Sequence, residues 1–181
     1  EGRGQAEALA KRLQPVKLTA IYASHLERAR ETARFLAKGR ALKVSVRRNL
    51  ADIQTGAWTG KSIKQAARTK LWKTIQTAPK EARMPDGESF DELRARLVAE
   101  LEAIRLEYPK GIVAIVSHAD AIKVVVAHYL GLDLNFFQRL VIAPASLTVL
   151  QVDKKAARLA RLNDTGQLDA APPRRHRQKK S

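Results

Sequence analysis

Apolar side chains recur along the chain with two spacings, one typical of helices and one typical of strands. Spacings of three and four residues predict helices at about 5–13, 24–38, 62–77, 89–108 and 120–130. Short apolar runs predict strands at 18–23, 44–46, 112–116, 146–152 and 157–162. Because strands and helices alternate, we expect an α/β fold, a three-layer α/β/α sandwich with a mainly parallel sheet.

Local signals set the expected ends of these elements. Ser24 with Glu27, and Ser89 with Glu92, have the spacing of a capping box at a helix start. Gly39 is a plausible stop for the first of these two helices. Glycine, proline and polar clusters predict a loop at 50–62, turns at 84–88 and 135–139, and a hairpin turn at 153–155.

Composition points to one folded domain with a basic tail. Apolar residues make up 45% of the chain, which argues against global disorder, so we assign 1–165 to the domain and 166–181 to a basic, disordered tail. The absence of cysteine excludes disulfides, thiolate metal sites and a cysteine nucleophile. No signal peptide or stretch of 18 apolar residues is visible, so we expect a cytoplasmic protein without a membrane span. The oligomeric state is not predicted.

The chain carries 34 Lys and Arg against 18 Asp and Glu, a formal charge of +16. Such a balance favours anionic partners, although a solvated, soluble surface explains it equally well. Five of the basic residues lie in 174–180, so the tail is a candidate polyanion-binding segment. Trp58 and Trp72 are not interleaved with this run, so we expect nucleic-acid binding at most non-specifically, through the tail.

A histidine stands where a buried strand meets a helix. His118 follows the apolar run 112–116, and Arg28 lies one turn into the helix after the strand 18–23. Ligands of such sheets bind beyond the carboxyl ends of the strands, so both side chains could face one crevice and hold an anion. Asp52, in the loop after Leu50, could protonate a leaving group. A core histidine, a solvated arginine and an ordinary loop acid are the alternatives.

Four segments resemble motifs of one family, in the family's order. SHLERARETA (24–33) resembles S-P-L-x-R-A-x-x-T-A, and LADIQTGAWTG (50–60) resembles L-x-E-x-x-x-G-x-W-x-G. PDGES (85–89) resembles P-G-G-E-S, and VSH (116–118) resembles V-S-H-G. These are motifs of the histidine phosphatase superfamily, also called phosphoglycerate mutase-like, and the chain is most similar to its bacterial phosphomutases and phosphatases.

The resemblance implies phosphoryl transfer without a metal or cofactor. In the family, a histidine of an R-H-G motif attacks a small phosphomonoester and becomes phosphohistidine. By motif position, Arg28 would bind phosphate, His118 would be the second histidine and Asp52 the acid. Ser117 and Ala119 would add backbone contacts to the phosphate.

This chain departs from the family pattern at three places. It has no R-H-G motif: its histidines are His25, His118, His128 and His176. We therefore expect truncation, with the nucleophile and the first central strand missing, and expect residues 1–181 alone to be inactive and unstable. Asp52 stands where many members have Glu, which puts its reach in doubt. Ala119 replaces a glycine, which is tolerable unless the backbone needs a positive φ.

Three functions are compatible with these residues. The first is a phosphomonoester phosphatase or phosphomutase in its full-length form, of which hydrolysis is the simpler. The second is a phosphate-binding pseudoenzyme, and the third is a polyanion-binding protein acting through the tail. Substrate specificity is expected from residues 61–88, whose lysines suit an anionic substrate, although a solvated helix face explains most of them.

Overall fold

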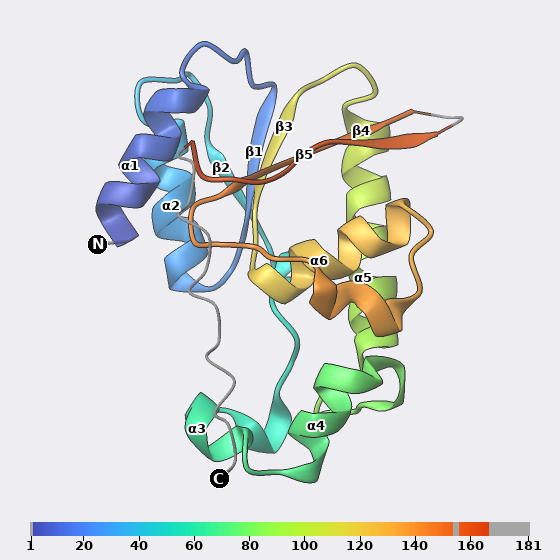
Figure 1. Ribbon diagram of the computed structural model, residues 1–181. Coiled ribbons are helices and arrows are strands. Elements are labelled where there is room, and N and C mark those ends of the chain that lie inside the picture. Colours follow the sequence, from blue (N-terminus) through green and yellow to red (C-terminus); the bar gives the residue numbers. More distant parts are fainter. Residues whose placement is uncertain (1, 154–155, 167–181) are drawn as a thin grey trace, which may run out of the picture.

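The computed structural model of the protein describes residues 2–153 and 156–166 (Figure 1). Its helices are α1 (Gly2–Leu13), α2 (Glu27–Ala37), α3 (Ile63–Ala66), α4 (Lys70–Thr77), α5 (Phe90–Glu107) and α6 (Ala119–Tyr129). Its strands are β1 (Ala20–Ser24), β2 (Val44–Arg47), β3 (Val113–Val116), β4 (Leu147–Val152) and β5 (Ala157–Asp164). Short 3-10 helices are η1 (Arg48–Leu50), η2 (Gly56–Trp58), η3 (Pro79–Glu81) and η4 (Leu134–Arg139). The predicted tail lies outside the described residues apart from Gly166, as do positions 154 and 155 of the predicted hairpin turn.

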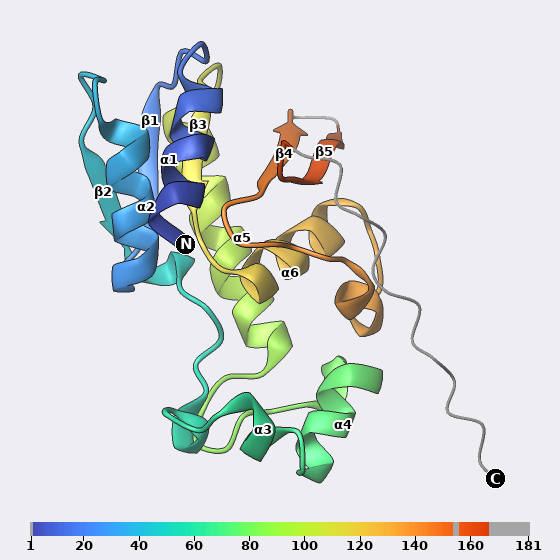
Figure 2. The same ribbon diagram turned by 60° about the vertical axis from the view of Figure 1, so that its left-hand side comes forward.

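The central sheet is parallel and has the order β2-β1-β3. Because side chains alternate along a strand, β1 serves both faces. Ile21 and Ala23 pack with Leu36 of α2, whereas Tyr22 packs with Ile104 of α5. Helices α1 and α2 therefore cover one face and α5 the other (Figure 2). This arrangement confirms the predicted three-layer α/β/α sandwich with a mainly parallel sheet.

Strands β4 and β5 form a separate antiparallel hairpin. Leu147 of β4 and Ala114 of β3 border the same apolar cluster, so the hairpin lies beside the sheet without being paired to it. Within the described residues, β3 is hydrogen-bonded to β1 on one edge and to no strand on the other. An open edge on a strand this apolar is a place where a further strand could pair.

A second core joins α4, α5, α6 and η4. The rings of Phe90 and Phe137 pack at a tilt of 44° with their centroids 4.8 Å apart, in the same cluster as buried Leu97 and Val124. This core fixes the start of α6, and with it the position of His118, against the long helix α5. In the part of the chain that the structure describes, no helix combines the length and apolar character needed to cross a membrane.

The structure corrects one of the two predicted capping boxes. Helix α2 begins at Glu27 with Leu26 as its N-cap and no side-chain cap, and Ser24 is the last residue of β1. The Ser24 hydroxyl instead accepts from the Leu26 N–H and meets His118. The Ser89–Glu92 capping box is confirmed, with both reciprocal hydrogen bonds present.

The single helix predicted over 62–77 is wrong, because the chain forms two short helices there. Ser62 caps α3 through a capping box with Gln65, and Thr69 caps α4 by accepting from the Trp72 N–H. The weak apolar pattern hid this second start, since Thr69 competes for backbone hydrogen bonds in the middle of the predicted helix. The two helices are consequently free to form two sides of a pocket.

Replacing Leu97 by Ala should lower the free energy of unfolding by about 2–5 kcal/mol, because it leaves a cavity in the second core. Leu97 is 1% exposed, whereas Leu106, on the same helix, is 70% exposed. Leu106→Ala is the matched control and should change stability by less than about 0.5 kcal/mol. Urea unfolding of both variants makes the comparison, and equal effects would show that the second core does not support α5.

Candidate active site

The carboxyl ends of β1 and β3 bring Ser24 and His118 together. The His118 Nε2 atom lies 2.9 Å from the Ser24 Oγ atom, and His118 is 6% exposed. His118 is also the N-cap of α6 and makes no side-chain cap bond there. The first turn of a helix has backbone N–H groups without helical partners, so this edge of the sheet suits an anion.

Arg28 and Asp52 lie at the same edge. Arg28, in the first turn of α2, places its Nη2 atom 3.6 Å from the Asp52 Oδ2 atom. The Arg28 side chain is 66% exposed, so its guanidinium can also turn toward a ligand. The structure thus brings together Arg28, Asp52 and His118, which the sequence placed 24 to 90 positions apart.

The ionisation of His118 is set by its surroundings. Burial, the guanidinium of Arg28 and the nearby His25 together lower the pKa of His118 to about 4. The imidazole is therefore neutral at pH 7 in the ligand-free site. An anion bound beside it would offset the charges of the neighbouring groups, accept a hydrogen bond from the imidazolium and so stabilise the protonated form. His25, whose buried Nδ1 atom has no hydrogen-bond partner, is a neighbour that the sequence alone did not assign to the site.

The pKa of Asp52 is raised, chiefly by burial and next by the carboxylate of Asp120. The Ile53 N–H, which donates to Oδ1 at 3.1 Å, and the guanidiniums of Arg28 and Arg96 oppose this rise. A carboxyl group held toward its protonated form can give a proton to a leaving oxygen. Local geometry therefore suits the acid role predicted for Asp52.

Asp120 and Lys123 are additional polar groups that the motifs did not single out. Asp120 lies in the first turn of α6, two positions after His118, and its Oδ1 atom accepts from Lys123 Nζ at 3.1 Å. Lys123 also donates to Gln138 Oε1 at 3.2 Å. The only sequence signal for Asp120 was its closeness to His118 in the chain.

A largely buried ion pair fixes the loop that carries Asp52. Arg96 of α5 donates from Nε and Nη2 to the two carboxylate oxygens of Glu88, at 2.9 and 2.8 Å. Their side chains are 16% and 9% exposed. The Arg96 guanidinium further donates to three carbonyl oxygens of the loop, those of Asn49, Ala51 and Asp52.

The segments 50–60 and 85–89 interlock at their backbones. The Ala57 N–H donates to the Pro85 carbonyl at 2.8 Å, and the Glu88 N–H donates to the Gln54 carbonyl at 2.9 Å. A Cβ atom added at Gly56, where φ is 52°, would come within 2.1 Å of the Pro85 oxygen. One added at Gly87 would come within 2.3 Å of the Gln54 oxygen. Close packing therefore requires glycine at positions 56 and 87.

Ser117 and Ala119 flank His118. The Ser117 hydroxyl donates to the Leu50 carbonyl at 2.7 Å, so this side chain ties β3 to the loop that carries Asp52. Ala119 is the first residue of α6 and does not have a positive φ. Alanine in place of the family's glycine therefore introduces no backbone strain.

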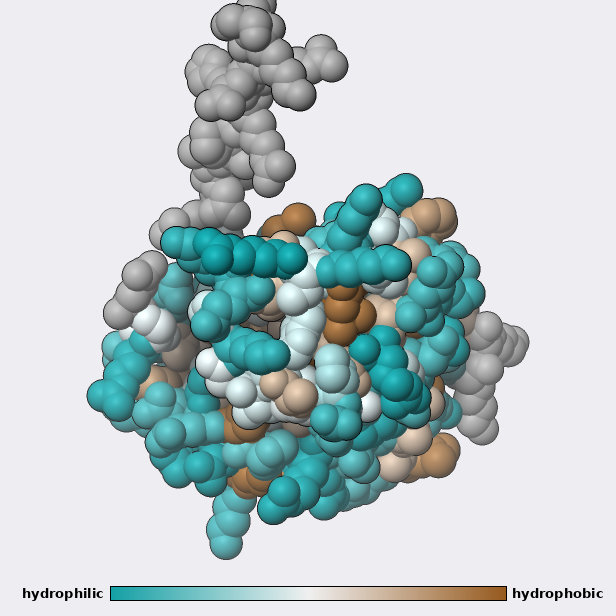
Figure 3. Space-filling model, turned by 90° about the horizontal axis from the view of Figure 1, so that it is seen from below, coloured by the Kyte–Doolittle hydropathy of each residue, from teal (hydrophilic) through white to brown (hydrophobic). Residues whose placement is uncertain are grey.

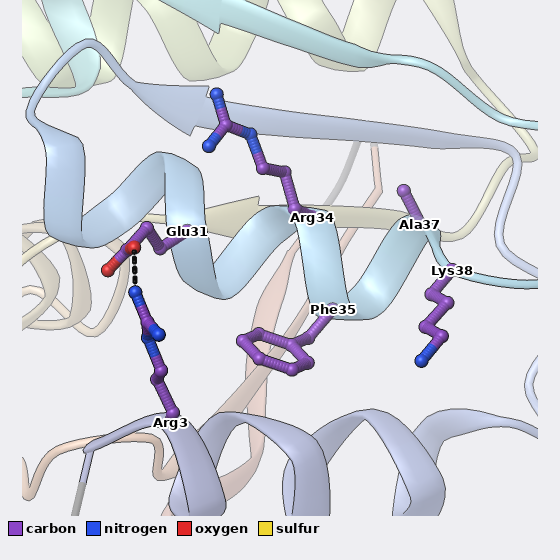
Figure 4. A pocket seen from close by; sticks show the side chains of 6 residues that line it. All are labelled: Arg3, Glu31, Arg34, Phe35, Ala37 and Lys38. Carbon is purple, nitrogen blue, oxygen red and sulfur yellow. Dashed lines mark hydrogen bonds and ion pairs between the residues drawn. The ribbon is translucent and has the colours of Figure 1, made fainter.

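Two surface cavities differ in their relation to these residues. The larger, of about 530 Å³, lies against α1 and α2 and is lined by Arg3, Glu31, Arg34, Phe35, Ala37 and Lys38. In Figure 4, Arg3 reaches Glu31 across the cavity while Arg34 points away from α1. A second cavity of about 280 Å³ has both Asp52 and Asp120 in its wall. Only this second cavity adjoins the candidate site.

Over residues 2–153 and 156–166, no group of three or more His, Asp or Glu side chains could hold a metal ion. What the site does offer is one guanidinium, a neutral imidazole and a carboxyl group with a raised pKa.

Breaking the ion pair on one side should destabilise the protein. Glu88→Gln keeps the shape but leaves the Arg96 charge without its carboxylate, which should cost about 3–5 kcal/mol in urea unfolding. Lys80→Gln, which removes the exposed Lys80–Asp133 pair, is the control and should cost less than about 1 kcal/mol. Equal costs for the two variants would contradict a stabilising role for the buried pair.

The ionisation of His118 can be measured by NMR titration of its ring protons. In ligand-free protein the pKa should be about 4, and saturating inorganic phosphate should raise it, because an anion favours the imidazolium form. His128, in the last turn of α6, is the internal control, and its resonances should not respond to phosphate. A His118 titration that phosphate leaves unchanged would remove this residue from the site.

Comparison with known proteins agrees with the geometry. The sequence profile of the histidine phosphatase superfamily (branch 1) matches residues 1–165. Phosphoserine phosphatase 1 of Hydrogenobacter thermophilus is 27% identical over 91% of this chain and 79% of its own length. The "probable phosphoglycerate mutase GpmB" of Photorhabdus laumondii is 31% identical over 81% of this chain and 69% of its own. The solved structure of Bacillus stearothermophilus YhfR superposes with a TM-score of 0.85 at 27% identity, covering 90% of this chain and 82% of that one. The chain belongs to the histidine phosphatase superfamily.

Proposed function

We propose that this protein hydrolyses small phosphomonoesters and that the phosphoryl group sits at the carboxyl edge of β1 and β3. The observation that carries the proposal is the convergence of Arg28, Asp52 and His118 at that edge. The superfamily contains phosphatases and phosphomutases, and its activity is phosphoryl transfer. Hydrolysis is preferred because a mutase must also retain the phosphoenzyme until a second substrate receives the phosphoryl group.

Each residue has a distinct part in the proposed reaction. The Arg28 guanidinium and the His118 imidazole bind phosphoryl oxygens, together with the free N–H of Ala119 at the start of α6. Such groups stabilise the charge on the transferring group, which supplies most of the rate in phosphoryl transfer. Asp52 gives its proton to the leaving alkoxide. Ser117 acts through its bond to Leu50, as a residue that positions the loop.

The attacking group in this proposal is a histidine on a strand paired with the open edge of β3. Its nitrogen forms a bond to phosphorus while the bond from phosphorus to the leaving oxygen breaks, and Asp52 protonates that oxygen. Water then attacks phosphorus and gives a proton to the Asp52 carboxylate, while the N–P bond breaks, so that inorganic phosphate leaves and the histidine and the Asp52 acid are restored. Support comes from the unpaired edge of β3, which would bring an adjacent strand's carboxyl end to the position of His118.

The test uses the natural full-length protein with p-nitrophenyl phosphate and with an alkyl phosphate. We expect phosphate release and a mass increase of one phosphoryl group after an alkaline quench, which preserves phosphohistidine. Asp52→Asn should slow the alkyl substrate by about a hundredfold to ten-thousandfold, since its leaving group needs the proton. It should slow p-nitrophenyl phosphate much less, because p-nitrophenolate leaves without a proton.

Asp133→Asn is the matched control, because Asp133 caps η4 on the surface and asparagine preserves the cap. This variant should keep full activity toward both substrates. A full-length protein that binds phosphate at Arg28 and His118 but never releases it from an ester would be a pseudoenzyme, against the proposal. Nucleic-acid binding that disappears with residues 174–180, in a protein without phosphatase activity, would instead favour the polyanion-binding function.

A further inference from the structure

The cavity beside Asp52 is formed by parts of the chain that are distant in sequence. Its apolar wall comes from the loop after η1, from η2, α3 and α4, from the connection between α4 and α5, and from the start of α5, with Ile53, Trp58, Ile63, Trp72, Met84 and Phe90 as its principal members. Asp52 and Asp120 close the end toward the phosphoryl site. The volume, about 280 Å³, is near the lower limit of ordinary ligand pockets.

The position of Asp52 fixes what this cavity receives. In the proposed reaction Asp52 protonates the leaving oxygen, so that oxygen must lie at its carboxyl group. Arg28, whose Nη2 atom lies 3.6 Å from Asp52 Oδ2, would hold the phosphoryl group, whereas the cavity is lined by Asp52 but not by Arg28 or His118. The remainder of the leaving alcohol therefore enters the cavity.

The wall chemistry is unfavourable to a second anionic group. Lys61 is the one cation that lines the cavity among the described residues, while Asp52 and Asp120 are both acidic. Lys123, beside Asp120, is already held by that carboxylate and by Gln138. A carboxylate or second phosphate on the leaving group would lose its hydration next to two acidic groups, at a considerable cost. Of the lysines in residues 61–88, which were expected to suit an anionic substrate, only Lys61 lines the cavity.

Apolar side chains at this end of the molecule are partly exposed to solvent. Ile63 is 73% exposed although it lines the cavity, and Trp58 and Trp72 are half-buried. Figure 3 looks at the molecule from below, the end at which α3 and α4 lie in Figure 1, and shows strongly hydrophobic side chains reaching the surface among hydrophilic ones. An apolar ring placed here would cover surface that water now contacts.

We infer that this cavity binds the leaving group and selects phosphomonoesters of small, uncharged alcohols with an aromatic or alkyl body, over esters that carry a second acid. This inference rests on the proposed function, because Asp52 must be the acid at which the leaving oxygen lies. Apolar contact supplies the selectivity, and the pair of tryptophans favours a planar ring.

The test compares three phosphonates, which bind without being hydrolysed, by calorimetry on the natural full-length protein. Benzylphosphonate should bind about tenfold to a hundredfold more tightly than methylphosphonate, the range expected for burying a phenylalanine-sized ring. A carboxylated analogue, 3-phosphonopropionate, should bind no more tightly than methylphosphonate. Equal affinities for the benzyl and methyl compounds, or tightest binding of the carboxylated one, would overturn the inference while leaving the phosphate site intact.

Ile63→Ala should weaken benzylphosphonate about threefold to tenfold and leave methylphosphonate unchanged, because it removes apolar wall without touching the phosphate site. Ile63 is largely exposed, so the substitution should spare the fold. Ile112→Ala, at an isoleucine that is 54% exposed and lies outside the cavity, is the matched control and should change neither affinity. If neither the phosphonates nor inorganic phosphate bind, the phosphate site itself fails, and the proposed function fails together with this inference.

Discussion

The candidate site depends on the ion pair between Glu88 and Arg96. The guanidinium of Arg96 is bound on one side by both carboxylate oxygens of Glu88 and on the other by carbonyl oxygens of residues 49–52. Removing two charges from water is costly, and a buried pair is rarely a net gain in stability unless its remaining hydrogen-bonding groups are satisfied. In this protein those groups are satisfied. The role of the pair is therefore to hold Asp52 in place against α5, a helix that is distant from Asp52 in the sequence.

The electrostatics of the site follow from that fixed geometry. Asp52 is held close enough to Asp120 and far enough from water for its pKa to rise, while burial lowers the pKa of His118. Both groups thus tend toward their neutral forms in the ligand-free site, and Arg28 remains as an exposed cation beside Asp52. A phosphate entering the site would reverse the balance at His118, so that binding of the anion and protonation of the imidazole reinforce each other.

Most helices and strands could be predicted from the sequence because their buried positions recur with regular spacing. The strand ending at His118 and the helix starting after Ser89 are both signalled by local patterns of apolar and capping residues. Ser24 shows where local reasoning failed: its hydroxyl could cap a helix, but the long-range contact with His118 places it in the strand. Arg96 could not have been found, because a charged residue on a helix gives no sign of a partner on a distant loop.

The cavity illustrates the same limit and shows why a fold alone does not specify a substrate. Residues 61–88 look basic in sequence, and counting lysines there favours an anionic ligand. Folding reverses that impression, since α3 and α4 turn Ile63 and Trp72 toward the cavity while Lys64, Lys70 and Lys73 remain exposed and outside its lining. The amino-acid composition of a segment describes its whole surface, but substrate specificity depends on the few side chains that line the cavity. The cavity exists because the chain forms two helices, α3 and α4, with Thr69 as the N-cap of the second. The single continuous helix expected from periodicity could have lined the cavity with only one face.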